Sequence, residues 1–477
     1  MSRREMLREF LATWPGRIGT FALAVLVVVS IVAIATFPTD FGKAKWSNPA
    51  VWADNPKSAP PAWSNIFTGN DQLRHEKLKA ERPGKVEASD GLEVRSYVMP
   101  YSFPAHKPPK FLSVSIGGVT FHERPPTLSV HILRPDGSEA ALNREAVRGP
   151  RDGESAPYSR FKDEPLRVAL TSEPAAVDAL REMYLDTYGA DIRSSDLRQV
   201  MNRALFGKPS ESKPGEIALL KGRYELIVKA TLYDGRDSVD FSRFVVGGTT
   251  FGLMGTDGQG RDLAQGLIFG LPVALIIGII AAVMTTLIGA GLGILGGYVG
   301  GKTDMVIQRF ADIVNNVPLL PLLIFFVFIV GSHLYLILLF LVAFSWPGLT
   351  ILLRSMVLQI RSGQLIESSI AMGASKWRIM YRHIFPQMAP FIISQLIFLV
   401  PAAILAEAGL SFLGLGDPSI PTWGQILENG FRTGAVYLGY WWWVIPPGVL
   451  IIITAVTFML IALGLEPVVN PRLRKVR

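Results

Sequence analysis

The sequence contains no cysteine, and charged residues make up only 18% of its 477 positions. The absence of cysteine excludes a disulfide framework, a thiolate metal site and a thiol nucleophile. The small share of charge, together with 49% hydrophobic residues and a positive mean hydropathy, is atypical of a soluble enzyme. This composition is typical of a membrane protein that carries one sizeable polar part.

The net charge of +8 does not by itself indicate a nucleic-acid-binding protein. Binding of nucleic acid requires basic residues that cluster on one face of a soluble domain. Here many basic residues lie beside hydrophobic runs, where the preference of positive charge for the cytoplasmic side of a membrane accounts for them. We therefore expect no nucleic acid among the partners.

The first hydrophobic run, residues 18–37, contains no charged residue. A helix rises ~1.5 Å per residue, so this run is long enough to cross the ~30 Å core of a bilayer. A cleaved signal peptide is the alternative interpretation, but the run is long for one and no clear small-x-small cleavage site follows it. We expect an uncleaved first transmembrane helix.

From about Leu263 onward the sequence is almost entirely apolar. Residues 313–353 are long enough for two spans, which a turn at residues 331–333 would separate. Residues 263–301 would fit one span or two. One span places the basic residues of the short connecting segments on one side of the membrane, with Arg432 as the exception, whereas two spans would divide them between both faces. Six spans with both termini in the cytoplasm fit the charges better.

The predicted fold is an α-helical membrane protein of six transmembrane helices with an inserted extracytoplasmic domain. Its predicted segments are a cytoplasmic N-terminus at 1–17, the first transmembrane helix at 18–37, the inserted domain at 38–262, a transmembrane domain at 263–466 with a cytoplasmic loop at 355–386, and a cytoplasmic tail at 467–477.

The inserted segment predicts a mixed α/β fold that is mainly β and sandwich-like. Alternation of apolar and polar residues predicts strands, helical spacing predicts helices, and Asp234-Gly235 between two alternating runs predicts a hairpin. The expected strands are 111–119, 127–133 and 224–233, and the expected helices are 175–189 and 195–207.

The histidines of the insert have no spacing that is typical of a metal site, and we predict that they are solvated or packed. They are His75, His106, His122 and His131. Its acidic residues lie among similar numbers of basic ones, which is typical of a solvated surface. We expect no metal and no catalytic residue in this chain.

Two glycine patterns lie near the end of the 263–301 run. Gly289, Gly293 and Gly297 recur every four residues, so they share a helix face and predict close helix packing. Residues 296–303, GGYVGGKT, match the phosphate-binding pattern G-x-x-x-x-G-K-T. That chemistry needs a preceding strand in a soluble α/β domain, whereas a hydrophobic span precedes this match. Lys302 is more simply a cytoplasmic charge at a helix end.

A basic island, ESSIAMGASKWRIMYRHIFPQMAP at residues 367–390, separates two of the hydrophobic runs. Residues 367–372 predict a helix, Gly373 can adopt the positive φ that ends it, and Ser375 can cap the next helix. Pro386 is expected to end that second helix before the following span. We predict two short helices with Ala371, Met372 and Ala374 near their tip, although a basic loop that merely follows membrane topology would show the same composition.

Glu367-Ser-Ser-x3-Gly373, with Ile384-Phe-Pro386 downstream, resembles the "EAA" loop of permease subunits in binding-protein-dependent ABC importers. Two further stretches are similar to the dipeptide, oligopeptide and nickel permease family of the prokaryotic inner membrane: GTDGQGRD at 255–262, and ILAEAGLSFLGLG at 404–416 followed by PTWG. The resemblance covers about half of the chain and leaves out the insert. The family's usual Ala-Ala is Ser368-Ser369 here, and its usual Ser-Arg after GRD is Ala264-Gln265.

This resemblance implies a type I ABC importer membrane subunit that pairs with a second homologous permease subunit, two cytoplasmic ABC ATPases and an extracytoplasmic solute-binding protein. It implies that ATP and Mg bind to the ATPases and that this chain holds no cofactor and catalyses no covalent chemistry. The implied site residues are an ATPase-coupling loop (Glu367, Ala371, Met372, Gly373, Ala374, Ser375 and Pro386) and an outer-gate motif (Gly255, Thr256, Asp257, Gly260, Arg261 and Asp262).

Glu407 is the best-placed charge within a predicted span, and such residues are candidates for a transport pathway. Because it lies near the outer end of its span, a structural role is an equal alternative. Peptides are the family's usual cargo, with oligosaccharides or nickel chelates as alternatives. A stand-alone secondary transporter or channel is a further alternative, although few charges lie mid-span. We also hypothesise that the insert extends the surface on which the binding protein docks.

Overall fold

The computed structural model describes the chain except for residues 1–2, 70, 90–91, 105–106, 211–215 and 470–477. It comprises two compact units: Met1–Pro49 together with Leu263–Arg477, called the helical unit, and Ala50–Asp262, called the insert. Residues 38–49 of the expected insert therefore belong to the helical unit. The basic residues of the predicted tail, beyond Val469, lie outside the described residues.

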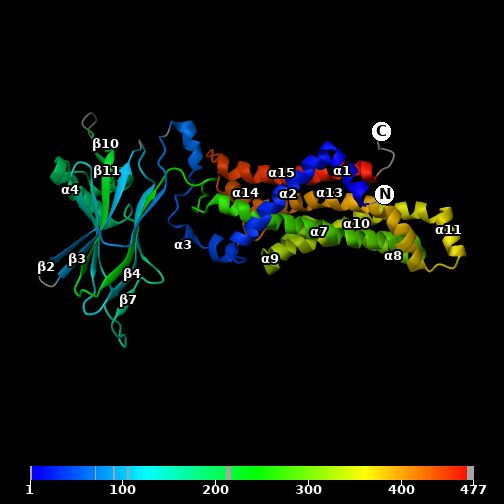
Figure 1. Cartoon of the computed structure of the whole chain (residues 1–477), viewed down its shortest axis with the longest axis horizontal. Helices are drawn as coiled ribbons and strands as arrows, with labels where there is room; N and C mark the ends of the chain where they lie inside the picture. Colours follow the sequence, from blue (N-terminus) through cyan, green and yellow to red (C-terminus); the bar gives the residue numbers. More distant parts are fainter. Residues whose placement is uncertain (1–2, 70, 90–91, 105–106, 211–215, 470–477) are drawn as a thin grey trace. The chain divides into compact units, whose positions relative to one another are not determined.

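The helical unit contains helices long and apolar enough to span a membrane (Figure 1). Five single helices meet this description within the described residues, and a bent pair of helices gives a sixth candidate. In chain order its helices are α1 (Arg3–Ala12), α2 (Trp14–Thr36), η1 (Gly42–Trp46), α7 (Leu263–Val299), α8 (Gly301–Asn316), α9 (Leu319–Val330), α10 (Leu334–Arg361), α11 (Gln364–Ala371), α12 (Lys376–Ile379), η3 (Met380–Ile384), α13 (Phe385–Phe412), α14 (Trp423–Arg432) and α15 (Trp441–Val469).

The first span begins earlier than its uncharged run because local capping starts the helix. The hydroxyl of Thr13 accepts a hydrogen bond from the Gly16 backbone N–H at 3.1 Å. Pro15 lies in the first turn, where a backbone N–H would have no acceptor within the helix, so proline is tolerated there. The helix is α2, and its glycines lie close to α15, since a Cβ at Gly19 would meet Ile461 and Leu460.

A single helix, α7, covers the run that permitted one span or two. Its glycine face packs against α10, as the four-residue spacing predicted. A Cβ at Gly289 would meet Leu349, one at Gly293 would meet Leu353, and one at Gly297 would meet Val357. The prediction of close helix packing is confirmed, because only a hydrogen at these positions allows the backbones to approach so closely.

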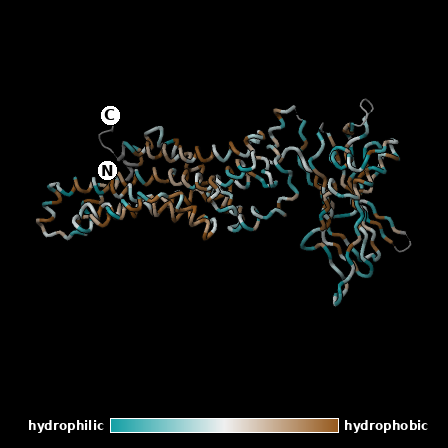
Figure 2. Tube along the Cα trace, turned by 180° about the vertical axis from the view of Figure 1, so that it is seen from behind, coloured by the Kyte–Doolittle hydropathy of each residue, from teal (hydrophilic) through white to brown (hydrophobic). Residues whose placement is uncertain are grey.

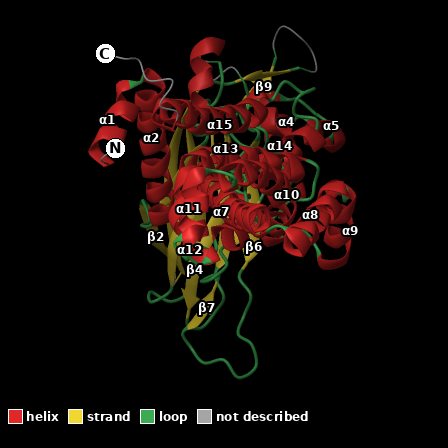
Figure 3. Ribbon diagram, turned by 90° about the vertical axis from the view of Figure 1, so that its right-hand side faces the viewer, coloured by secondary structure: helices red, strands yellow, loops and turns green. Residues whose placement is uncertain are grey.

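The predicted span before residue 331 is broken. The amphipathic α8 meets the 12-residue apolar α9 at an angle of 74°, and both lie at the edge of the helical bundle (Figure 3). The break has a local cause: Pro318 disfavours helical backbone at the residue before it, and Val317 is extended with ψ 124°. The next turn forms where expected, with Gly331 at φ 96°.

The insert is a β-sandwich. One sheet has the strand order β1-β12-β4-β7 with β8 also on β4, and the other has the order β2-β3-β11-β5-β6. The named strands pair antiparallel, including β9 with β10 in a small separate sheet. The strands are β1 (Glu76–Ala80), β2 (Lys85–Ser89), β3 (Leu92–Phe103), β4 (Phe111–Phe121), β5 (Thr127–Leu133), β6 (Glu139–Ala146), β7 (Tyr158–Arg160), β8 (Leu166–Val168), β9 (Gly207–Pro209), β10 (Ile217–Leu219), β11 (Gly222–Leu232) and β12 (Ser238–Gly247).

Aromatic side chains of β3 and β11, two strands of one sheet, meet Phe206 in the core of the sandwich. Phe206 lies 5.1 Å from Phe103 and 5.0 Å from Tyr224, between ring centroids, and all three are fully buried. Helix α4 (Pro174–Tyr188) adds Leu180 and Tyr184 to the same cluster. Figure 2 shows the contrast in sequence: strands alternate in hydropathy, whereas the long helices are hydrophobic along most of their length.

Two predictions for the insert are wrong. Asp234-Gly235 does not form a hairpin, because β11 and β12 lie in different sheets and the turn crosses between them. The helix expected at 195–207 is interrupted at Val200, giving α5 (Ser194–Gln199) and α6 (Met201–Ala204), and Gly207 begins β9. In the first case long-range strand pairing overrode the local pattern, and in the second Gly207 pairs with Leu219 of β10 instead of continuing a helix. The three predicted strands and the first predicted helix are present, and His106 lies outside the described residues.

A two-part segment joins the sandwich to the rest of the chain. We call residues 50–73 and 249–262 the stem. Its halves are hydrogen-bonded: Leu73 O accepts from Thr249 N at 2.8 Å, and Pro60 O accepts from Phe251 N at 2.8 Å. The stem includes η2 (Ala62–Thr68), whereas α3 (Pro49–Trp52) starts just before it.

Candidate functional site

The basic island forms the turn that its sequence predicted. Helix α11 ends at Ala371, and Gly373 follows with φ 81°, a conformation that costs little only for glycine. The Ser375 hydroxyl then accepts from the Arg378 backbone N–H at 3.4 Å and caps α12. This turn lies at one end of the helical unit, the end towards which α1 also lies (Figure 1).

One side of the island is anchored in the helical unit. Ile366, Ile379 and Ile384 are almost completely buried, and they belong to an apolar cluster that includes Tyr298 and Val357 of α7 and α10. Ser369 is also buried and donates to Leu365 O at 2.7 Å. These contacts fix the island against the two central helices.

Five large apolar side chains in or next to the island are exposed. Met372 is 80% exposed, Trp377 73% and Tyr381 79%, with Leu365 and Ile370 also more than half exposed. We call these five residues the loop surface. Sequence reasoning named only Met372 among them, although aromatic residues inside a basic loop are a usable signal, since such side chains are enriched at interfaces.

The other predicted loop residues lie around this surface. Ala371, Gly373 and Ser375 are exposed, and Ala374 is half-buried. Glu367 is exposed on α11, and no described residue pairs with its carboxylate, so its predicted role in holding the loop's shape stays a prediction.

Pro386 does not end the second helix, and this prediction is wrong. It lies in the first turn of α13, which follows the π-helical η3 without a break, so that residues 376–412 form one continuous helical run. A proline is tolerated in a first turn, and a π-helical stretch absorbs the irregularity that it introduces.

An ion pair that the sequence did not reveal ties α8 to α10. The guanidinium of Arg354 donates to both carboxylate oxygens of Asp304, from Nε at 2.5 Å and from Nη2 at 2.6 Å. Such a two-bond pair fixes orientation as well as distance. The phosphate-loop match lies here too, across the end of α7 and the start of α8. It follows a helix and not a strand, so it lacks the fold that nucleotide binding requires.

The GTDGQGRD motif forms a buried turn of the stem. Thr256, Asp257 and Arg261 are each less than one-tenth exposed. One carboxylate oxygen of Asp257 accepts from the backbone N–H groups of Gln259 and Arg261, both at 2.9 Å, and the other accepts from the Arg261 side chain. Gly255 and Gly260, at φ 73° and 83°, allow the turn to close.

The same motif is bonded to the first half of the stem. The Thr256 hydroxyl donates to Pro56 O at 2.6 Å and accepts from Ala59 N at 2.9 Å, and the Asn55 side chain donates to Gly260 O at 3.0 Å. The backbones of Asp262 and Thr256 form an antiparallel β-bridge that closes the turn. We call this hydrogen-bonded turn, residues 255–262 with Asn55, the clamp, and it lies directly before α7 in the chain. The predicted role of the motif at an outer gate stays a prediction.

Glu407 is buried in the last part of α13, where the Ser411 hydroxyl donates to its Oε1 at 2.7 Å. A hollow of about 80 Å³ lies elsewhere between α7, α10 and α13, lined by small residues with Thr285 and Ser345. Glu407 is not among the residues that line it. Its bond within its own helix fits the structural alternative, and a role in the transport pathway stays a prediction.

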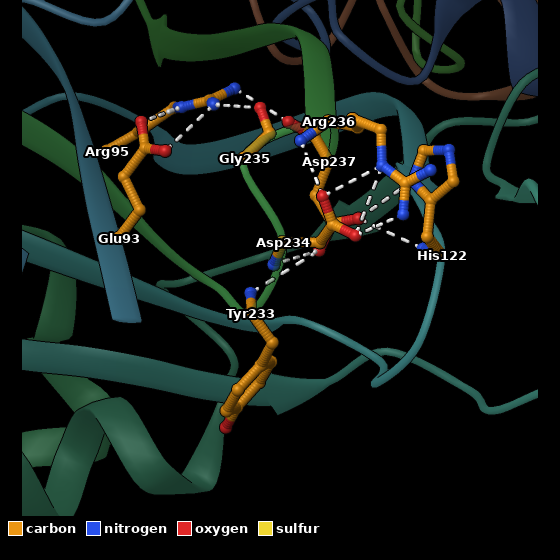
Figure 4. A network of polar contacts seen from close by, with 8 residues as sticks. All are labelled: Glu93, Arg95, His122, Tyr233, Asp234, Gly235, Arg236 and Asp237. Atoms are coloured by element: carbon orange, nitrogen blue, oxygen red, sulfur yellow. Dashed lines mark hydrogen bonds and ion pairs between the residues drawn. The ribbon is translucent and has the colours of Figure 1, made fainter. Parts of the chain in front are cut away.

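One cluster in the insert has the composition of a metal site, as Figure 4 shows. Ligand atoms of His122, Asp234 and Asp237 lie within 4.8 Å of one another. The carboxylates are already engaged: Arg236 donates to Asp234 at 2.6 Å and lowers its pKa, and Asp237 accepts from the backbone N–H groups of His122 and Asp234 at 3.0 and 3.1 Å. We assign the cluster a structural role, because it fixes the turn that crosses between the sheets.

Comparison with known proteins agrees with this architecture. Residues 289–475 match the family described as "Binding-protein-dependent transport system inner membrane component". The dipeptide transport system permease protein DppC of Bacillus subtilis is 33% identical over 222 residues, which are 46% of this chain and 69% of that protein. The glutathione transport system permease protein GsiD of Pectobacterium atrosepticum is 32% identical over 243 residues, or 51% of this chain and 80% of that protein.

Among solved structures, the MetNI methionine ABC transporter in an inward-facing conformation matches 44% of this chain and 98% of that chain, with 23% identity. The TM-score of this match is 0.36. The family match begins after the insert, so the insert lies outside the matched residues. The matched half, with its apolar helices, makes the chain a multi-pass inner-membrane protein, and it belongs to the permease family of binding-protein-dependent peptide ABC importers.

Proposed function

We propose that this chain is one of two permease subunits in an ATP-driven importer of peptides or similar small solutes. It forms half of the translocation pathway and pairs with a second, homologous permease. Two cytoplasmic ATPases bind ATP and Mg and drive the cycle, and an extracytoplasmic binding protein delivers the solute. The observation that carries this proposal is the loop surface, whose exposed apolar side chains lie on a turn that is anchored to the central helices.

The loop surface supports a coupling mechanism. Exposed Met372, Trp377 and Tyr381 offer apolar area to a groove on an ATPase. Closure of the ATPases would move the island, and the buried Ile366 and Ile379 would carry the movement to α7 and α10. The helices would then change from inward-open to outward-open, provided that the ATPases in their closed state bind the second arrangement more tightly. No covalent step is assigned to this chain.

The proposed orientation places both termini and the island in the cytoplasm and the insert outside. Two observations support it. Helix α1 and the island lie towards the same end of the helical unit (Figure 1), and the loop carries Lys376, Arg378 and Arg382, as cytoplasmic segments tend to do.

A pull-down from native membranes in mild detergent tests the assembly. The tagged chain should recover a second permease and two ATPases, or one ATPase in two copies. Met372→Glu and Trp377→Glu should each release the ATPases, because a charge would enter the apolar contact. Leu413→Glu, at the far end of α13 and 60% exposed, is the matched control and should retain them. Recovery of the chain alone, or release by the control as well, would refute the proposal.

The substrate is tested through the binding protein. Its bound solute, identified by mass spectrometry after capture, should be a peptide. An oligosaccharide or a nickel chelate would keep the machinery and change the cargo. Uptake into vesicles that persists without ATP, or without the ATPases, would favour a secondary transporter.

We further propose that the insert enlarges the docking surface for the binding protein. The structure suggests a cut for this test: Leu73 and Thr249 are hydrogen-bonded neighbours, so residues 74–248 can be replaced by a short Gly-Ser linker. The stem, with its Thr256 and Asn55 contacts, remains. The shortened chain should assemble with the ATPases but bind the binding protein more weakly, and an unchanged affinity would contradict the hypothesis.

A further inference from the structure

The stem exposes four large apolar side chains close together. Trp63 is 40% exposed, Ile66 74%, Phe67 81% and Leu253 63%. We call these residues the stem patch. None of the described aromatic residues of the sandwich is exposed, so the exposed Trp63 and Phe67 stand out within the insert. Such a patch marks a surface that contacts something other than water.

The local structure of the stem holds the patch together. Trp63 and Ile66 are three residues apart in η2, a 3₁₀-helix, in which residues at this spacing lie on the same side. The Trp63 ring meets Phe67 edge-on at 6.4 Å, and its Nε1 donates to Leu253 O at 2.8 Å. The patch therefore combines both halves of the stem.

A cation and a hollow adjoin the stem patch. Trp63 and Ile66 line an open pocket of about 580 Å³ together with Phe251 and Arg74, and Arg74 is exposed. Exposed aromatic and aliphatic side chains beside a basic residue have the composition of protein segments that lie in the headgroup region of a membrane.

Chain length limits how far the patch can lie from the first residue of α7. Leu253 is ten residues before Leu263, where α7 begins. An extended chain covers at most ~3.6 Å per residue, so Leu253 lies within roughly 36 Å of the start of a span. The clamp shortens this reach, because Asp257 and Arg261 are held in a tight turn.

We propose that the stem patch inserts into the membrane–water interface, with its apolar side chains among the upper acyl chains and Arg74 at the phospholipid phosphates. The patch anchors the insert to the bilayer independently of the transmembrane helices. This proposal requires only that α7 spans the membrane, and it does not depend on the identity of the substrate or the partners.

The absence of native cysteine allows a direct test with the full chain. Phe67→Cys and Ile66→Cys, each with a spin label, are placed in nanodiscs of phosphatidylethanolamine and phosphatidylglycerol. Relaxation is compared between oxygen, which concentrates in lipid, and a water-soluble nickel chelate. Val86→Cys on β2 and Leu185→Cys on α4, both about half exposed, are matched controls in the sandwich.

Labels at 66 and 67 should be several-fold more accessible to oxygen than to the nickel chelate, and those at 86 and 185 should show the reverse. Arg74→Glu should make the labels at 66 and 67 more accessible to the nickel chelate. The proposal would be overturned if the labels at 66 and 67 were both more accessible to the nickel chelate than to oxygen. Protection from both reagents would also overturn it, since a protein partner would then cover the patch. Two label positions keep the test valid if one variant fails to fold.

Discussion

The two units of this chain place their large apolar side chains in opposite ways. In the insert, Phe206 and Tyr224 are fully buried. In the helical unit, Leu287 of α7 and Phe328 of α9 are 62% and 90% exposed, while glycines such as Gly293 occupy the contact between α7 and α10. The solvent explains the difference: water drives apolar groups inward, whereas lipid leaves close backbone packing to hold helices together.

The comparison teaches where each unit is vulnerable. The insert depends on the volume of its core, so it should be sensitive to the loss of large side chains. The helical unit depends on the close approach of its helix backbones, so it should be sensitive to any side chain added at a glycine contact. The stem patch differs from the core of the insert, because it exposes Trp63 and Phe67, and our proposal that it lies in the membrane interface accounts for this exposure.

Loss of a core ring should have the largest effect on the insert. Phe206→Ala removes a ring that contacts Phe103 and Tyr224, and we expect a loss of ~3–5 kcal/mol in the free energy of unfolding of the sandwich. Hydrogen exchange of the strands, measured by mass spectrometry on the full chain, reports this value. Val86→Ala, on an exposed position of β2, should change it by less than ~0.5 kcal/mol. Equal effects of the two substitutions would contradict the proposed core.

Gain of a side chain should have the next largest effect, in the helical unit. A Cβ at Gly293 would lie 2.9 Å from both Leu353 Cβ and Thr350 O, so Gly293→Leu should separate α7 from α10 at a cost of ~3 kcal/mol. Gly291→Leu is the matched control, because nothing lies within 4 Å of its Cβ position. Thermal unfolding in detergent should show a lower midpoint for the first variant alone. A similar midpoint for both would mean that the glycine face is not a contact.

A half-buried histidine, His75, is expected to make the insert sensitive to acid. The pKa of His75 is lowered from 6.5 to about 4, mainly by burial and to a smaller extent by repulsion from the Lys77 cation. His75 therefore binds a proton more readily in the unfolded chain than in the folded one. The contribution of neutral His75 to the free energy of unfolding is fully present above pH ~6.5 and is lost as the pH falls towards 4. Between pH 7 and 4 the insert should lose ~2 kcal/mol more than the His75→Leu variant. Hydrogen exchange at both pH values measures the difference, and parallel losses would rule out His75 as the cause.

The smallest effect concerns the turn that crosses between the sheets. Asp237→Ala removes the carboxylate that accepts from the backbone N–H groups of His122 and Asp234, and we expect a loss of ~1–2 kcal/mol. Gly235→Ala, whose Cβ would meet nothing within 4 Å, should cost less than ~0.5 kcal/mol. Local exchange in β11 and β12 reports both. If Asp237→Ala were silent, the network of Figure 4 would not hold the crossing.

Sequence reasoning succeeded where a local pattern has one physical outcome. The four-residue spacing of Gly289, Gly293 and Gly297 predicted a packed helix face, and alternation predicted β4, β5 and β11. The island's turn was also predictable, because Gly373 and Ser375 each favour one backbone role.

The same reasoning failed where distant segments decide the outcome. Asp234-Gly235 has the composition of a hairpin, but β11 pairs with β3 and β5 while β12 pairs with β1 and β4. Pro386 has the character of a helix end, but it lies in the first turn of a helix that continues through it. The ion pair between Asp304 and Arg354 joins residues 50 positions apart, and no local sequence pattern predicts it.

The sequence by itself determined the apolar spans, the polar insert between the first and second of them, and the family motifs, because length, hydropathy and residue order are properties of the chain alone. Tertiary structure decided which strands share a sheet, which side of the island is buried and which apolar residues of the stem are left exposed. These outcomes depend on the free energy of contacts between distant segments, which a local sequence pattern does not contain.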